Sequence, residues 1–190
     1  MTAASTELST EQLILRRWRE ADREPFARMN QDPLVMKHFP SLLSREESDA
    51  LVDRIRDHFS RHGFGWWAAE LREPGAFIGF IGLSVPRFEA AFTPCVEIGW
   101  RLAREFWRKG LAIEGARAVA RCAFDELCLP GIVSFTVPAN VASRRVMEKL
   151  GMTRDMHDDF DHPLLPEPHP MRRHVLYRLQ RANWKSLASP

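Results

Sequence analysis

The periodicity of apolar residues along the chain alternates between that of helices and that of strands. Apolar residues three or four positions apart predict helices with one buried face over 21–30, 45–61, 111–127 and 141–150. Short apolar or alternating runs predict strands over 12–18, 64–71, 76–85, 95–102, 132–137 and 173–179. Residues 153–171 are polar and rich in proline, which indicates a long loop or a hairpin. The mixture predicts one α/β domain over 1–190, with its core at about 11–180 and short flexible ends.

Two of these helices carry recognisable end signals. Ser44 and Glu47 form a capping box, in which each side chain can bond the backbone N–H of the other. Gly63 follows the last turn of the same helix and predicts its end. Asn140 is a favourable N-cap for the helix over 141–150, and Gly151 stands where a glycine commonly closes a helix.

The stretch from Glu97 to Ala123 combines a strand, a basic loop with a glycine, and the start of a helix. Arg108, Lys109 and Gly110 directly precede the predicted helix. Unpaired N–H groups and the positive end of the helix dipole favour an anion there, such as a pyrophosphate. A tight turn with solvated basic side chains explains the same spacing. The stretch matches neither GxxxxGK[ST] nor GxGxxG, so it does not indicate those two nucleotide-binding loops.

Composition and charge argue against several classes of protein. With 27 Lys and Arg against 25 Asp and Glu, the net charge of +2 argues against a nucleic-acid-binding protein. The hydrophobic fraction of 45% is too high for a disordered chain. No apolar run reaches the roughly 18 residues of a membrane span. Cys95, Cys122 and Cys128 form no CxxC pair and predict neither a disulfide framework nor a zinc site. These features and a polar N-terminus predict a cytoplasmic protein with reduced thiols.

Two motifs resemble a known family. WRKGLA, residues 107–112, resembles the Q/R-x-x-G-x-G/A pyrophosphate loop of the GNAT superfamily of acyl-CoA-dependent N-acyltransferases. Trp107 replaces the usual Q/R and is similar to the W-x-K-G-x-A form of the RimJ/RimL-like branch. NVASRRVMEKLGM, residues 140–152, resembles the second signature of that branch. The order of elements from Gln12 to about Leu179 also fits, so the resemblance covers nearly the whole chain.

This resemblance implies a fold and a co-substrate. The fold would be a mixed, mostly antiparallel sheet of about six or seven strands, splayed in the middle and flanked by about four helices. Acetyl-CoA would lie in the splay between the strands 95–102 and 132–137, and no metal is expected. The pantetheine would pair with the backbone around Arg101 and Leu102 and contact Asn140. The resemblance assigns the pyrophosphate to the loop residues Trp107, Arg108, Lys109, Gly110, Leu111 and Ala112.

The reaction implied is direct transfer of an acetyl group to a primary amine in a ternary complex. The resemblance makes Glu97 the candidate general base and Ser143 the candidate acid or hydrogen-bond donor to the thiol. Many branches carry a tyrosine acid at the position of Met147, and that tyrosine is absent here. A positioning role for Glu97 and a capping role for Ser143 remain as alternatives. A non-catalytic acyl-CoA-binding module or sensor also remains open.

The segment 155–169 carries His and Asp residues at spacings that match no defined metal site. A solvated acidic loop is the simpler interpretation, and a loop over the substrate entrance that favours a cationic amine is a further one. The acceptor, a protein N-terminus or a small-molecule amine, is not determined by the sequence. Exposed edge strands leave a homodimer open.

Overall fold

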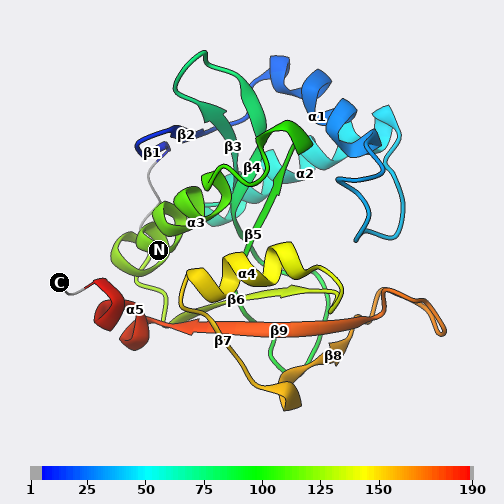
Figure 1. Cartoon of the computed structure of the whole chain (residues 1–190), viewed down its shortest axis with the longest axis vertical. Coiled ribbons are helices and arrows are strands. Elements are labelled where there is room, and N and C mark those ends of the chain that lie inside the picture. The colour runs from blue at the N-terminus through cyan, green and yellow to red at the C-terminus, as the bar shows by residue number, and fades with distance from the viewer. Residues whose placement is uncertain (1–5, 189–190) are drawn as a thin grey trace.

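The computed structural model describes residues 6–188, with side chains over 6–184, and its strands form one connected sheet (Figure 1). The helices are α1 (Arg23–Gln31), α2 (Arg45–His62), α3 (Leu111–Arg121), α4 (Val141–Lys149) and α5 (Arg181–Ala188). The strands are β1 (Leu8–Ser9), β2 (Leu13–Arg16), β3 (Trp66–Leu71), β4 (Phe77–Ser84), β5 (Glu97–Leu102), β6 (Gly131–Thr136), β7 (Thr153–Arg154), β8 (Phe160–Asp161) and β9 (Arg173–Gln180). Short helical turns are η1 (Glu20–Asp22), η2 (Arg104–Phe106), η3 (Cys122–Glu126) and η4 (Met156–Asp158).

The sheet is mixed and mostly antiparallel, as predicted. Its strands run in the order β1-β2-β3-β4-β5-β6-β9-β7, and β8 pairs separately with β9. Only the β5–β6 pair is parallel among the described strands. β5 and β6 pair at a single position, Glu97 opposite Val133, whereas β4 and β5 pair over six positions. The sheet is therefore splayed between β5 and β6, which confirms the predicted opening.

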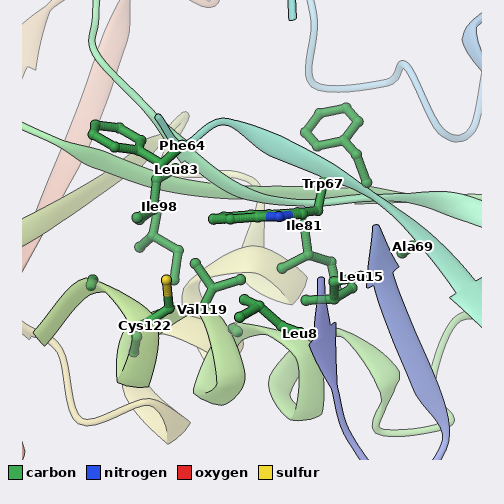
Figure 2. Close-up of a cluster of buried hydrophobic side chains, with 14 of the residues drawn as sticks. Leu8, Leu15, Phe64, Trp67, Ala69, Ile81, Leu83, Ile98, Val119 and Cys122 are labelled. Carbon is green, nitrogen blue, oxygen red and sulfur yellow. The ribbon is translucent and has the colours of Figure 1, made fainter. Parts of the chain in front are cut away.

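The α3 helix and the α1 helix cover opposite faces of the β2–β5 half of the sheet. The methyl group of Ile81 reaches Gly115 of α3, while the neighbouring Phe80 packs on Phe26 of α1. Successive residues of a strand point to opposite faces, so the two helices lie on opposite sides. Figure 2 shows the α3 side, where Val119 and Cys122 face the apolar residues of the sheet.

Local end signals act as expected. Ser44 Oγ accepts from the Glu47 N–H (3.1 Å), and the Glu47 carboxylate accepts from the Ser44 N–H (2.7 Å). Gly63 closes α2 in the left-handed region, with φ 75°. Gly151 has φ 85° after α4, so both glycines occupy a region that side chains disfavour.

Some elements differ from the sequence prediction. The helix predicted over 111–127 is α-helical only to Arg121 and continues as the π-helical turn η3, where the Leu127 N–H bonds the Cys122 carbonyl (3.0 Å). The segment 153–171 contains β7 and β8, both paired with β9, so the hairpin alternative holds. The sheet has nine strands, and α5 is a fifth helix. The last predicted flexible residues, 189–190, lie outside the described part, whereas 186–188 belong to α5.

Candidate active site

The splay leaves one edge of β5 without a partner strand. The Val133 N–H donates to the Val96 carbonyl (2.9 Å), so the peptide group of Val96 faces β6. Peptide groups alternate in direction along a strand, so those of Ile98, Trp100 and Leu102 face the same side. The Ile98 N–H still belongs to the ladder position of Glu97 and Val133, and the sheet diverges beyond it, so the Trp100 groups and the Leu102 N–H line an open edge. Arg101, predicted to offer its backbone, pairs instead with Phe80 of β4 and faces away from the splay.

The loop after β5 folds back onto the end of that strand. The indole N–H of Trp107 donates to the Leu102 carbonyl (2.7 Å), so Trp107 fastens the loop to the strand. Arg108 and Gly110 both adopt positive φ, 60° and 81°, which turns the chain into α3. Gly110 is the N-cap of α3 and supplies no side-chain cap. The first N–H groups of α3 therefore remain available to an anion.

A cavity of about 550 Å³ lies beside the splay. Glu97, Arg101, Asn140 and Ser143 all line it, although they come from β5, α4 and the turn before α4. The structure thus brings both predicted catalytic residues to one cavity. The predicted pyrophosphate residues 107–112 lie outside the lining of this cavity, in the loop and first turn that precede and begin α3.

Glu97 combines burial with a single hydrogen-bond partner in the described part of the chain. Burial raises the pKa of its carboxyl to about 7, although the hydrogen bond from Ser84 Oγ to Oε2 (3.1 Å) acts in the opposite direction. A carboxyl with such a pKa is half ionised near neutral pH, which suits a general base. Of the residues from 6 to 184 that line the cavity, Glu97 is the only carboxylate.

Ser143 lies in the first turn of α4 with its hydroxyl unbonded to any other described residue. Its N–H donates to Asn140 Oδ1 (3.3 Å), and Asn140 Nδ2 donates to Thr136 Oγ1 (3.0 Å). The capping role predicted for Asn140 is therefore present. Tyr177, the one tyrosine, bonds Glu148 (2.9 Å) and does not line the cavity.

Arg101 is the residue whose side chain the sequence analysis missed. Its Nη1 donates to Asn30 Oδ1 (2.6 Å), and the guanidinium lies 4.0 Å from the ring centroid of Phe39. Burial lowers the pKa of this side chain to about 10, which still leaves it charged at neutral pH. A strand position alternating with apolar residues offers a weak signal for such a role, because it also fits a solvated arginine.

Residues 12–153 match the family described as an acetyltransferase (GNAT) domain. The chain belongs to this family. The acetyltransferase is 31% identical to the uncharacterized protein YkkB of Bacillus subtilis over 150 aligned residues. The aligned region covers 78% of this chain and 86% of YkkB. The acetyltransferase is also 32% identical over 175 residues to the FsC-acetyl coenzyme A-N(2)-transacetylase of Aspergillus fumigatus, which covers 88% and 73%.

Solved structures agree with the fold of the acetyltransferase. An acetyltransferase from Agrobacterium tumefaciens is 27% identical, has a TM-score of 0.74, and is aligned over 95% of this chain and 97% of that one. A GNAT-family acetyltransferase from Bacillus anthracis has a TM-score of 0.76 at 24% identity, over 93% and 99% of the two chains. The family accounts for acetyl-CoA as the acetyl donor.

The acidic residues of the segment 155–169 face arginines of the acetyltransferase rather than its cavity. Asp158 pairs with Arg178 (2.7 Å), Asp161 pairs with Arg173 (3.3 Å), and Asp159 pairs with Arg154. None of the three carboxylates lines the cavity. The described residues contain no group of three or more His, Cys, Asp or Glu placed to hold a metal ion. The loop itself borders the cavity through His162, Leu164 and Leu165, so it lies at the predicted place, whereas these three aspartates pair with arginines and do not face the cavity.

Burial distinguishes the aromatic side chains at the start of β3, and it also affects the thiol of Cys95. Trp66 lines the cavity, whereas Phe64 and Trp67 belong to the hydrophobic core. Burial, followed by the charge of Glu97, raises the pKa of the Cys95 thiol to about 11, so its thiolate is scarce at neutral pH. Within residues 6–188, no helix is both long enough and apolar enough to cross a membrane.

Proposed function

We propose that the acetyltransferase moves an acetyl group from acetyl-CoA to a primary amine, by direct transfer in a ternary complex. The observation that carries the proposal is the placement of Glu97 and Ser143 in one cavity beside the open edge of β5, where the half-buried Glu97 has a pKa raised to about 7. A primary amine is protonated at neutral pH and must lose a proton to react. A base of this pKa can accept that proton without being fully protonated itself.

Acetyl-CoA supplies the activated thioester when it is bound. The first N–H groups of α3 and the loop residues Arg108 and Lys109 would hold its pyrophosphate. The open edge of β5 offers backbone groups for the pantetheine, except the Leu102 carbonyl, which already accepts from Trp107. The fit rests on two observations, the uncapped start of α3 and the unpaired edge of β5.

The chemistry needs three contributions from the chain. Glu97 accepts a proton from the amine as the carbon–nitrogen bond forms. The N–H of Leu102, at the open edge, stabilises the negative charge that develops on the carbonyl oxygen. Ser143 donates a hydrogen bond or a proton to the sulfur as the carbon–sulfur bond breaks, which leaves the amide and free CoA.

The acceptor class has support from one relative and one motif. The name of the Aspergillus relative describes transfer to N(2), a nitrogen atom. The Trp107 form of the loop supports membership of the RimJ/RimL-like branch, and a protein N-terminus or a small-molecule amine is the acceptor we propose. Cys95, Cys122 and Cys128 form no disulfide in the described part of the chain, which supports a cytoplasmic location.

Thermal unfolding with acetyl-CoA, CoA, ATP and NAD in separate samples tests the donor. A ligand at 100 times its dissociation constant adds about 2.7 kcal/mol, so acetyl-CoA and CoA alone should raise Tm visibly. Thiol release with a panel of amines then tests turnover. We expect Glu97→Gln to lower kcat by about 10²- to 10⁴-fold without loss of CoA binding. Normal transfer by both Glu97→Gln and Ser143→Ala would refute the catalytic assignment, and CoA binding without turnover on any amine would favour an acyl-CoA sensor.

A further inference from the structure

The cavity carries more positive than negative charge. Arg54, Arg87 and Arg101 line it, against the single carboxylate Glu97 noted above. The lining histidines His38, His58, His162 and His174 all have lowered pKa values, mainly through burial, so they add little positive charge at neutral pH. Such a lining disfavours a polycationic acceptor and favours one that carries negative charge.

Arg101 is held in place from behind by two fully buried residues. Asn30 Oδ1 accepts from Arg101, while Asn30 Nδ2 donates to Ser48 Oγ (2.9 Å). Asn30 and Ser48 come from α1 and α2, and both are completely shielded from solvent. The amide can face Arg101 with only its oxygen, because its nitrogen is engaged by Ser48. The guanidinium is therefore oriented before any ligand binds, which is typical of a binding group.

Donors in this part of the cavity lack acceptors. The Asn30 bond is the one hydrogen bond that the Arg101 side chain makes to the described residues, and its buried Nε has no partner there. The half-buried guanidinium stays charged at neutral pH, and among residues 6–184 it forms no ion pair. The buried indole N–H of Trp66, stacked on Phe80 (4.8 Å), likewise lacks an acceptor within the described chain. Phe80 also lies 5.4 Å from the Arg101 guanidinium, so it adjoins both unpaired donors.

Gly99 leaves space between Arg101 and Glu97. The three residues share one face of β5, and the positions of Glu97 and Arg101 are about 13 Å apart along the strand. A Cβ at Gly99 would meet Trp66 Nε1 at 3.6 Å and Glu97 Oε1 at 3.7 Å. Gly99 has no side chain of its own, so this face of β5 lines the cavity with Glu97 at one end and the guanidinium of Arg101 at the other.

We infer that the acceptor is an amine that also carries a carboxylate, which binds the guanidinium of Arg101 while the amine lies at Glu97. This inference rests on the proposed amine transfer and names the acceptor class for the same site. An arginine fork matches a carboxylate with two parallel hydrogen bonds, and the Asn30 contact leaves donors free for both. The separation along β5 favours acceptors whose amine and carboxylate are several bonds apart.

Matched ligand pairs test the inference by calorimetric binding to the CoA-saturated enzyme, without requiring turnover. The pairs are 6-aminohexanoate with pentylamine, and glycyl-phenylalanine with its C-terminal amide. We expect the carboxylate member of at least one pair to bind about tenfold tighter or more. Arg101→Gln should abolish that preference, while Arg117→Gln, at an exposed position of α3, should retain it.

Asn30→Asp gives a second variant of nearly unchanged shape. It places a carboxylate against Arg101, so it should also weaken the carboxylate ligand while leaving the plain amine unaffected. This variant decides the question if Arg101→Gln fails to fold.

Three results would overturn the inference. The first is the absence of a carboxylate preference in every pair, and the second is a preference that survives both variants. The third concerns succinyl-CoA, an acyl donor that carries a carboxylate: Arg101→Gln would lose affinity for this donor rather than for the acceptor. The last result would assign the carboxylate to the acyl donor. The first two leave acetyl transfer intact, and failure of the proposed function would show instead as no CoA binding or no thiol release with any amine.

Discussion

Glu97→Gln should stabilise the folded protein at alkaline pH while it removes the proposed base. Burial raises the pKa of Glu97 from 4.5 to about 7, so the folded state binds this proton more tightly than the unfolded state. The contribution of Glu97 to stability therefore falls as pH rises between about 4.5 and 7. A rise of this size corresponds to about 3 kcal/mol at pH 8 and above. Glutamine keeps the shape and stays neutral throughout.

Urea denaturation of both proteins at pH 5 and pH 8.5 measures this effect. The free energy of unfolding of Glu97→Gln, relative to the native protein, should increase by up to about 3 kcal/mol between the two pH values. Glu114→Gln is the matched control, because bonds from Thr10 and Gln12 hold the pKa of Glu114 below its usual range. Between pH 5 and pH 8.5 that substitution should destabilise the protein by a nearly constant amount, because Glu114 stays ionised over this range. A pH-independent difference for Glu97→Gln would show that Glu97 ionises normally and would refute the reasoning.

Three further predictions follow from the same site. The kcat/KM profile should fall on the acidic side of about pH 7 as Glu97 is protonated. Ser84→Ala should move this acidic limb up by about one pH unit, because it removes a hydrogen bond that favours the carboxylate. An unmoved limb would mean that a group other than Glu97 titrates there. Trp107→Phe removes the hydrogen bond to the Leu102 carbonyl and should raise the Kd of CoA, measured by calorimetry, several-fold. The kcat at saturation should stay within about twofold of that of the native protein. An unchanged Kd would mean that the loop holds its shape without the indole. Gly99→Ala adds a methyl group at ordinary contact distance from Trp66 and Glu97, so the protein should fold with native Tm. The KM for the acceptor should rise without a change in CoA affinity. A native KM would exclude this face of β5 from acceptor binding.

The candidate site was only partly readable from the sequence. The family resemblance indicates Glu97 by its strand position and Ser143 by its motif, and the structure places both on one cavity. The orientation of the Arg101 side chain depends on Asn30, which lies 71 positions away in the chain. The pairing of the aspartates in the segment 155–169 was unreadable for a related reason, since Asp158 pairs with Arg178 on another strand. No local pattern reports which charges will meet across the fold.

The sequence by itself determined the features that depend on neighbouring residues. The capping box of α2, the glycine ends of α2 and α4, and the strand–loop–helix unit around residue 110 all depend on groups within a few positions of one another. Hydrogen-bond geometry and backbone sterics act over that range, so such features are readable without the fold.

Tertiary structure alone decided burial and the pairing of charges. The pKa of Glu97 is raised because elements from distant parts of the chain exclude water from it. Two-residue strands such as β7 and β8 exist because β9 lies beside them, and they are too short to leave a periodic signal. Solvent exclusion and long-range contact depend on how the whole chain packs, and these two effects give the cavity its chemistry.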